Sequence, residues 1–93
     1  MTPYVVWVPR LSVFYGIVIN MYFADHNPPH FHARYGEHQA LIRIDNGASI
    51  GGTLPRTAMR LVEQWRELHR DELVENWVLA HEPAPLFAIE PLQ

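Results

Sequence analysis

Apolar and polar residues alternate along the first half of the chain, which indicates β-strands. In residues 14–23, Ile17, Ile19 and Met21 would share one face of an extended chain. The intervening residues would share the other face, so this stretch predicts one half-buried strand. A shorter apolar run at residues 4–8 could form an edge strand, although the prolines on either side of it limit its pairing.

Three further strands are predicted after a rigid turn. Asn27-Pro28-Pro29 ends the first strand, because each proline removes a backbone donor and restricts the residue before it to extended conformations. Gly36-Glu37 is typical of a tight turn, and Asn46-Gly47 is a strong hairpin signal. Gly51-Gly52 predicts a bulge or a close approach of another segment. The predicted strands are residues 30–35, 38–45 and 48–54.

From Pro55 onward the apolar residues recur every three or four positions, which predicts helix. Pro55 suits the first helical turn. The buried stripe of this helix would consist of Ala58, Leu61, Val62, Trp65 and Leu68, with the charged residues, including Arg66, mostly outside it. Two interpretations fit the following segment: Asp71 caps a second helix, or one long helix continues to Ala80. We favour a break near His69.

These patterns predict an α+β domain. It would consist of an antiparallel β-meander of about four strands followed by one or two α-helices packed on one sheet face. The other sheet face would stay partly exposed. Pro83 and Pro85 end the helical region, and the apolar residues 86–89 would dock as an edge strand or pack as coil.

Composition narrows the function classes. The 93 residues correspond to one domain, and an apolar content of 48 % is ample for one core. A net charge of −3 does not favour general nucleic-acid binding. The absence of cysteine excludes disulfides, thiolate metal sites and a cysteine nucleophile. The apolar run near the N-terminus is too short to span a bilayer, so we expect a cytoplasmic protein with no membrane partner.

Residues 25–35 concentrate reactive side chains, including three of the six histidines. His30 and His32 lie two positions apart on a predicted strand, so both imidazoles can reach one ion. The proline turn would bring back His26 or Asp25 as a further ligand. Nitrogen and oxygen donors suit a divalent transition metal such as zinc, without distinguishing it from nickel, iron or manganese. In the alternative, structural interpretation, the histidines only pack and hydrogen-bond around the turn.

Two other uses of this stretch remain open, and the sequence does not decide whether the protein is an enzyme. His26, His30 and His32 are candidates for metal-free acid–base catalysis, for example cleavage of RNA, with Arg34 stabilising negative charge. The stretch could instead belong to a binding module without chemistry. Its surface would then include Tyr22, Arg34 and Tyr35, since aromatic and arginine residues are enriched at interaction hot spots.

The chain also resembles a known family. Residues 14–19 and 25–37, the segment Leu54-Pro55-Arg56 and the later residues Trp65, Trp77 and Pro85-Leu86 are similar to the bacterial family called domain of unknown function 4160. The resemblance covers Pro9 to the C-terminus, which implies a single domain at residues 9–93 and an N-terminal extension at residues 1–8.

The resemblance also carries an expectation about partners. Members of this family are often encoded beside another small domain, an arrangement similar to toxin–antitoxin pairs. It implies a component that binds a small partner protein encoded nearby, with toxin and antitoxin roles both open. A homodimer formed through an exposed sheet edge is a further expectation. The alternative function is a small metal-binding protein or metal-dependent hydrolase or nuclease that uses His26, His30 and His32 with Asp25.

Overall fold

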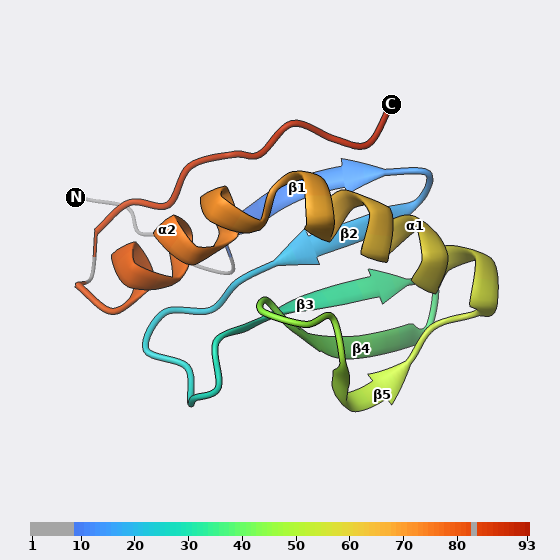
Figure 1. Ribbon diagram of the computed structural model, residues 1–93, viewed down its shortest axis with the longest axis horizontal. Coiled ribbons are helices and arrows are strands. Elements are labelled where there is room, and N and C mark those ends of the chain that lie inside the picture. The colour runs from blue at the N-terminus through green and yellow to red at the C-terminus, as the bar shows by residue number, and fades with distance from the viewer. Residues whose placement is uncertain (1–8, 83) are drawn as a thin grey trace, which may run out of the picture.

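The computed structural model describes residues 9–82 and 84–93, and its first half is an antiparallel sheet (Figure 1). The sheet order is β1-β2-β3-β4-β5, so each strand pairs with its neighbour in sequence. The protein is therefore an α+β domain with a β-meander, as predicted, but with five strands rather than about four. The strands are β1 (Arg10–Phe14), β2 (Ile17–Asn20), β3 (His30–Tyr35), β4 (His38–Arg43) and β5 (Ser49–Thr53).

The additional strand is β1, which lies before the stretch 14–23 that was predicted as one strand, except for Phe14. β1 and β2 pair antiparallel on either side of Tyr15 and Gly16. These two residues have φ values of 51° and 81°. Two successive positive φ values are typical of a two-residue hairpin turn whose twist matches that of the strands. The strand predicted over residues 14–23 is therefore confirmed only at residues 17–20, and the expected edge strand at residues 4–8 lies outside the described residues.

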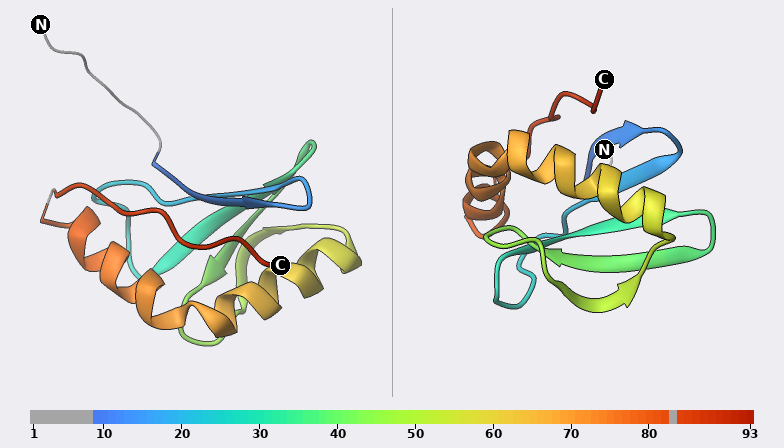
Figure 2. Two further views of the ribbon diagram at one scale, coloured as in Figure 1. Left: turned by 90° about the horizontal axis from the view of Figure 1, so that it is seen from above. Right: turned by 45° about the vertical axis from the view of Figure 1, so that its right-hand side comes forward.

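Two helices cover one face of the sheet (Figure 2). They are α1 (Arg56–Leu68) and α2 (Arg70–Ala80), with the predicted break at His69. His69, not Asp71, occupies the N-cap position of α2. Asp71 lies in the first turn, where its negative charge interacts favourably with the helix dipole. Leu68 was predicted to be buried but is 69 % exposed, because α1 ends there and the chain turns into α2.

The hydrophobic core lies between the sheet and the two helices. Trp65 is fully buried, with its ring centroid 5.4 Å from that of Phe14 and 5.7 Å from that of Phe31. The inward residues of β4 are Ala40 and Ile42, which alternate with more exposed neighbours. Burial of the apolar side chains in this core is the main favourable contribution to folding.

The C-terminal residues 84–93 run as coil between β1 and the helices (Figures 1 and 2). The backbone N–H of Ile89 donates to the carbonyl of Leu11 at 2.8 Å, so the tail contacts the edge of β1. The indole N–H of Trp65 donates to the carbonyl of Glu90 at 2.9 Å. Of the two expected arrangements, the tail therefore adopts coil, with one hydrogen bond to an edge strand.

Arg66 joins α1 to the loop between β4 and β5. Its side chain is buried, contrary to the prediction that it lies outside the buried stripe. The guanidinium donates to the carbonyl of Ile44 at 2.8 Å and to the Glu63 carboxylate at 2.6 and 2.9 Å. A buried charge is tolerated only when it is paired and hydrogen-bonded, and both conditions hold here.

A candidate metal centre

The candidate centre lies where the loop after β2 returns to the sheet. His30 and His32 occupy the first and third positions of β3, so their side chains leave the strand on the same side. Asp25 lies in the preceding loop, before Asn27-Pro28-Pro29. The stiff proline segment reverses the chain and places the Asp25 carboxylate beside both imidazoles.

Three ligand atoms converge at this point. Asp25 Oδ2 lies 3.1 Å from Nε2 of His30 and 3.2 Å from Nε2 of His32. One donor atom from each of the three residues lies within 4.8 Å of the other two. The side chains of Asp25, His30 and His32 are 23 %, 4 % and 14 % exposed. The group is therefore close to the surface but largely shielded from water.

The backbone fixes the orientation of His30. Its Nδ1 lies 2.7 Å from the carbonyl oxygen of Pro28. Because a carbonyl can only accept, Nδ1 carries the hydrogen, and a neutral ring then has its lone pair on Nε2. That lone pair is buried, forms no hydrogen bond and faces the Asp25 carboxylate. Two such groups at 3.1 Å attract each other only when a proton or a cation lies between them.

His32 is held between an acid and an aromatic ring. Its Nε2 is within hydrogen-bond distance of Asp25 Oδ2, whereas its Nδ1 is buried and has no partner among the described residues. The ring of Tyr22 meets the His32 ring edge-on, with centroids 4.4 Å apart. The centroid of the His30 ring lies 5.3 Å from that of His32. These contacts orient the imidazole without occupying its second nitrogen.

The electrostatics favour a carboxylate beside a neutral imidazole. Burial opposes ionisation of Asp25, but hydrogen bonds from the His26 backbone and His32, together with the charges of both histidines, hold its pKa below the usual range. Burial lowers the pKa of His32, and its hydrogen bond with Asp25 only partly offsets this. An ionised carboxylate and an unprotonated imidazole are the forms that bind metal ions.

The C-terminal end of α2 supports the Asp25 loop. Nε2 of His81 lies 2.8 Å from the backbone carbonyl of Asp25, and its Nδ1 lies 2.9 Å from the carbonyl of Trp77. Both partners are acceptors, and these two hydrogen bonds raise the pKa of His81. In addition, the N–H of Ala24 donates to the carbonyl of Ala80 at 3.1 Å. This support was not predictable from the sequence, because it depends on how α2 packs.

The other predicted site residues do not join this group. His26 is exposed and contributes only its backbone N–H, which donates to Asp25 Oδ1 at 2.8 Å. Arg34 is exposed on the same side of β3 as His32. Tyr22 contacts His32, but Tyr35 points to the opposite side of the strand and lines a pocket of about 100 Å³ with Pro55. Tyr22, Arg34 and Tyr35 therefore do not form one continuous surface.

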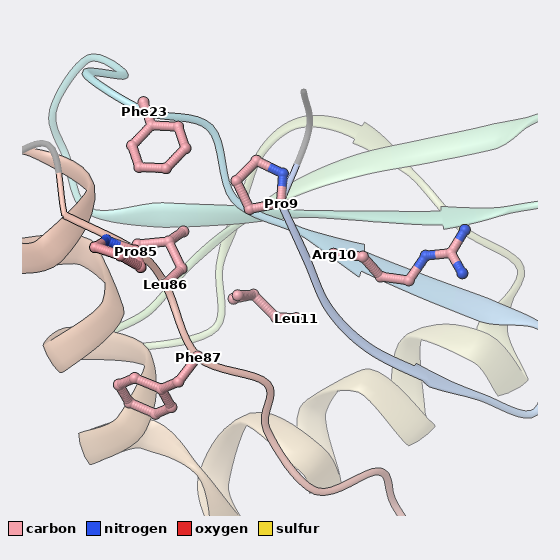
Figure 3. A pocket seen from close by; sticks show the side chains of 7 residues that line it. All are labelled: Pro9, Arg10, Leu11, Phe23, Pro85, Leu86 and Phe87. Carbon is pink, nitrogen blue, oxygen red and sulfur yellow. The ribbon is translucent and has the colours of Figure 1, made fainter. Parts of the chain in front are cut away.

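Another pocket, of about 270 Å³, lies between the start of β1 and the C-terminal tail (Figure 3). Its lining is almost entirely apolar, and includes Phe23, Leu86 and Phe87. The guanidinium group of Arg10 points away from the other labelled side chains. No pair of titratable groups lines this pocket, in contrast to the converging side chains of Asp25, His30 and His32.

This donor set suits a divalent transition metal. Two imidazole nitrogens and one carboxylate oxygen form the protein part of many zinc centres and of the two-histidine, one-carboxylate iron centres. The hydrogen bond from His30 to Pro28 is the kind of outer contact that orients a histidine ligand. The geometry thus fits a metal with three protein ligands and further positions for water.

Comparison with known proteins identifies the family. No curated protein and no solved structure matches the chain. Neither helix among the described residues is long and apolar enough to cross a membrane. The family model DUF4160, a domain of unknown function, matches residues 16–78, which include β2 to β5, α1 and most of α2. The match also contains all three residues of the candidate centre, and the chain belongs to this family.

Proposed function

We propose that this domain binds a divalent transition-metal ion through Asp25, His30 and His32. The observation that carries the proposal is the shared approach of both Nε2 atoms to Asp25 Oδ2, at 3.1 and 3.2 Å. A cation among these three atoms would satisfy the buried Nε2 of His30. It would also balance the negative charge of the Asp25 carboxylate and coordinate both imidazoles.

A metal held by three protein groups keeps positions for water. Such a metal lowers the pKa of bound water and generates a nucleophile near neutral pH, which is the basis of metal-dependent hydrolysis. His26 is exposed next to Asp25 and is the nearest candidate for a fourth protein ligand. Its participation would require a rotation of the side chain toward the three converging atoms.

The test is metal binding by protein purified without a histidine tag. Elemental analysis should find a transition metal, and zinc should raise the melting temperature of metal-free protein. At a zinc concentration 100 times Kd, the added stability is about 2.7 kcal/mol, which corresponds to an increase in melting temperature of roughly 11–22 °C for a domain of this size. The Asp25→Asn and His32→Ala variants should lose this shift. Absence of both bound metal and any shift with zinc, nickel, iron or manganese would leave the structural interpretation of the histidines.

His38 provides a matched control. It is an exposed histidine at the start of β4, opposite Tyr35 and thus at the far end of the hairpin from His30. His38→Ala should retain the full shift with zinc. His26→Ala separates two versions of the site, since an unchanged Kd excludes His26 as a ligand and a weakened Kd includes it.

A second proposal is a partner-binding role, as a component of a toxin–antitoxin-like pair in the cytoplasm. It is supported by the outer edge of β5, which pairs with no other described strand and carries Ile50 at 43 % exposure. Exposed edges accept strands from a partner or from a second copy of the chain. Co-expression with the protein encoded by the neighbouring gene should give co-elution in size-exclusion chromatography. A monomer that never co-elutes would contradict both the heteromeric and the homodimeric forms.

A further inference from the structure

Two arginines lie on the same sheet face as His30 and His32, beside the candidate metal centre. At its other end the centre contacts α2, where the His30 ring centroid lies 5.4 Å from that of Trp77. Arg43 pairs with His30 across β3 and β4, and cross-strand partners point to the same face with Cβ atoms about 5 Å apart. Arg34 lies two positions beyond His32 on β3, about 7 Å along the same face. Each guanidinium is on a long, flexible side chain. Both can therefore reach a molecule that lies over His30 and His32.

The two arginines differ in their present partners. Arg34 is exposed and forms no ion pair with a described residue. Arg43 binds the Asp45 carboxylate through two hydrogen bonds, of 2.7 and 2.9 Å. Arg34 is thus available for an anion at once, whereas Arg43 becomes available only when it releases Asp45.

The side chains around His32 are neutral, so they do not compensate the positive charge of Arg34. Across the strands, Asn20 faces His32 on one side and Leu41 on the other. Gln39 faces Arg34. None of these groups is acidic, and the Asp25 carboxylate is already engaged with the histidines. An anion bound above His32 would meet a metal, a guanidinium and an amide, and the adjacent acid, Asp25, would itself be a ligand of the metal.

The chemistry of the anion follows from these donors. Guanidinium groups present paired N–H donors that match the oxygens of a phosphoryl group. Divalent ions combined with arginines are a recurrent means of binding and neutralising phosphoryl groups. The net charge of −3 does not favour a long nucleic acid as the ligand. We infer that the metal centre binds a small phosphoryl compound, with Arg34 as the principal and Arg43 as the second phosphoryl-binding side chain. The inference rests on the metal binding proposed above.

The test uses cobalt-loaded protein and inorganic phosphate. Cobalt(II) reports its own coordination through visible absorption bands, so metal binding is observed before phosphate is added. Phosphate should then change the bands in a saturable way. Arg34→Ala should weaken phosphate binding about 10- to 100-fold, the loss expected for one charge-assisted hydrogen-bond pair, while the affinity for cobalt stays the same. The phosphate affinity of Arg34→Lys should lie between those of Arg34→Ala and the parent protein.

Two further variants sharpen the test. Arg70→Ala removes an exposed arginine at the start of α2, in the helical layer, and should leave phosphate binding unchanged. Asp45→Asn should tighten phosphate binding several-fold, because it releases Arg43 from its carboxylate partner. A gain of affinity from a substitution outside the metal centre is not expected from a purely structural role of Asp45.

The possible results separate the two proposals. If cobalt produces no bands, the metal centre and the phosphoryl site both fail. If cobalt binds but phosphate leaves the spectrum unchanged, or Arg34→Ala binds phosphate as well as the parent protein, only the phosphoryl site is overturned. Acetate is the comparison ligand, and acetate binding as tight as phosphate binding would also overturn it. A short RNA that binds where inorganic phosphate does not would overturn the small-molecule ligand in favour of a nucleic acid.

Discussion

Asn76 on α2 and Phe87 in the C-terminal tail are joined by two hydrogen bonds. Asn76 Nδ2 donates to the Phe87 carbonyl, and the Phe87 N–H donates to Asn76 Oδ1, both at 2.9 Å. The side chain of Asn76 is fully buried. The amide therefore acts as a substitute for a backbone strand partner, satisfying both polar groups of one residue in a segment that has no regular structure.

Asn76→Ala should destabilise the domain by about 2–4 kcal/mol, because it leaves both backbone groups of Phe87 without partners in a partly buried place. Urea unfolding of the variant measures this loss. Gln64→Ala, an exposed position on α1, is the control and should change the free energy of unfolding by less than about 0.5 kcal/mol. Equal stability of Asn76→Ala and the parent protein would show that the tail is not held by this amide.

Gly47→Ala should cost more stability than Gly36→Ala, although both glycines have positive φ, at 77° and 60°. A Cβ at position 36 meets nothing within 4 Å, so that change costs only the left-handed conformation, about 1 kcal/mol. A Cβ at position 47 would lie 2.8 Å from Arg66 Nε and closer still to Glu63 Oε1. The substitution therefore also disturbs the ion pair between the buried Arg66 and the exposed carboxylate of Glu63. Thermal unfolding of both variants compares them directly, and equal losses would contradict the predicted contact.

The Glu63–Arg66 pair should make stability fall in acid. The hydrogen bonds from Arg66 hold the pKa of Glu63 below its usual range, against the opposing effect of burial. A lowered folded-state pKa stabilises the protein above the unfolded-state pKa of about 4.3, and the contribution disappears as the pH falls through the folded-state value. Glu63→Gln should therefore be less stable than the parent protein at pH 6, with the difference shrinking toward pH 3. A difference that stays constant over this range would argue against the pair.

His81→Ala should loosen the Asp25 loop without unfolding the domain. The substitution removes the contact to the Asp25 carbonyl, next to the hydrogen bond between Ala24 and Ala80. Amide hydrogen exchange of Ala24 should become faster while core amides such as that of Ile42 keep their protection, as expected for local opening. His38→Ala, remote from this loop, should leave exchange at Ala24 unchanged. Uniform acceleration throughout the core would instead indicate global destabilisation.

The fold was predictable where buried residues recur at a regular spacing along the chain. The alternation in β3 and β4 and the helical spacing around Trp65 reflect one-sided burial, which sequence alone records. The Tyr15-Gly16 turn was missed because the residues on both sides are equally good strand formers. Gly16 inside a strand pattern was the available signal. Burial of Arg66 and Asn76 was not predictable, because each depends on carbonyls distant in sequence.

The candidate centre was predictable to the extent that it is local. Alternation places His30 and His32 on one side of β3, and the proline segment brings Asp25 back to them. The sequence could not show whether Asp25 or His26 joins the two histidines. The two are neighbours in a loop, and a single backbone rotation decides which side chain points toward His30 and His32. It also could not indicate His81, which lies 56 residues from Asp25 in the chain.

The tail that lies along β1 has a consequence for the order of assembly. β1 is the first described strand to leave the ribosome, whereas residues 84–93, which hydrogen-bond to it through Ile89 and Leu11, emerge only after all the described strands and helices. During synthesis the meander can form one hairpin at a time, because each strand pairs with the strand that follows it in sequence. The outer edge of β1 remains open throughout that time. Newly made chains are therefore most vulnerable to misassociation at their oldest strand.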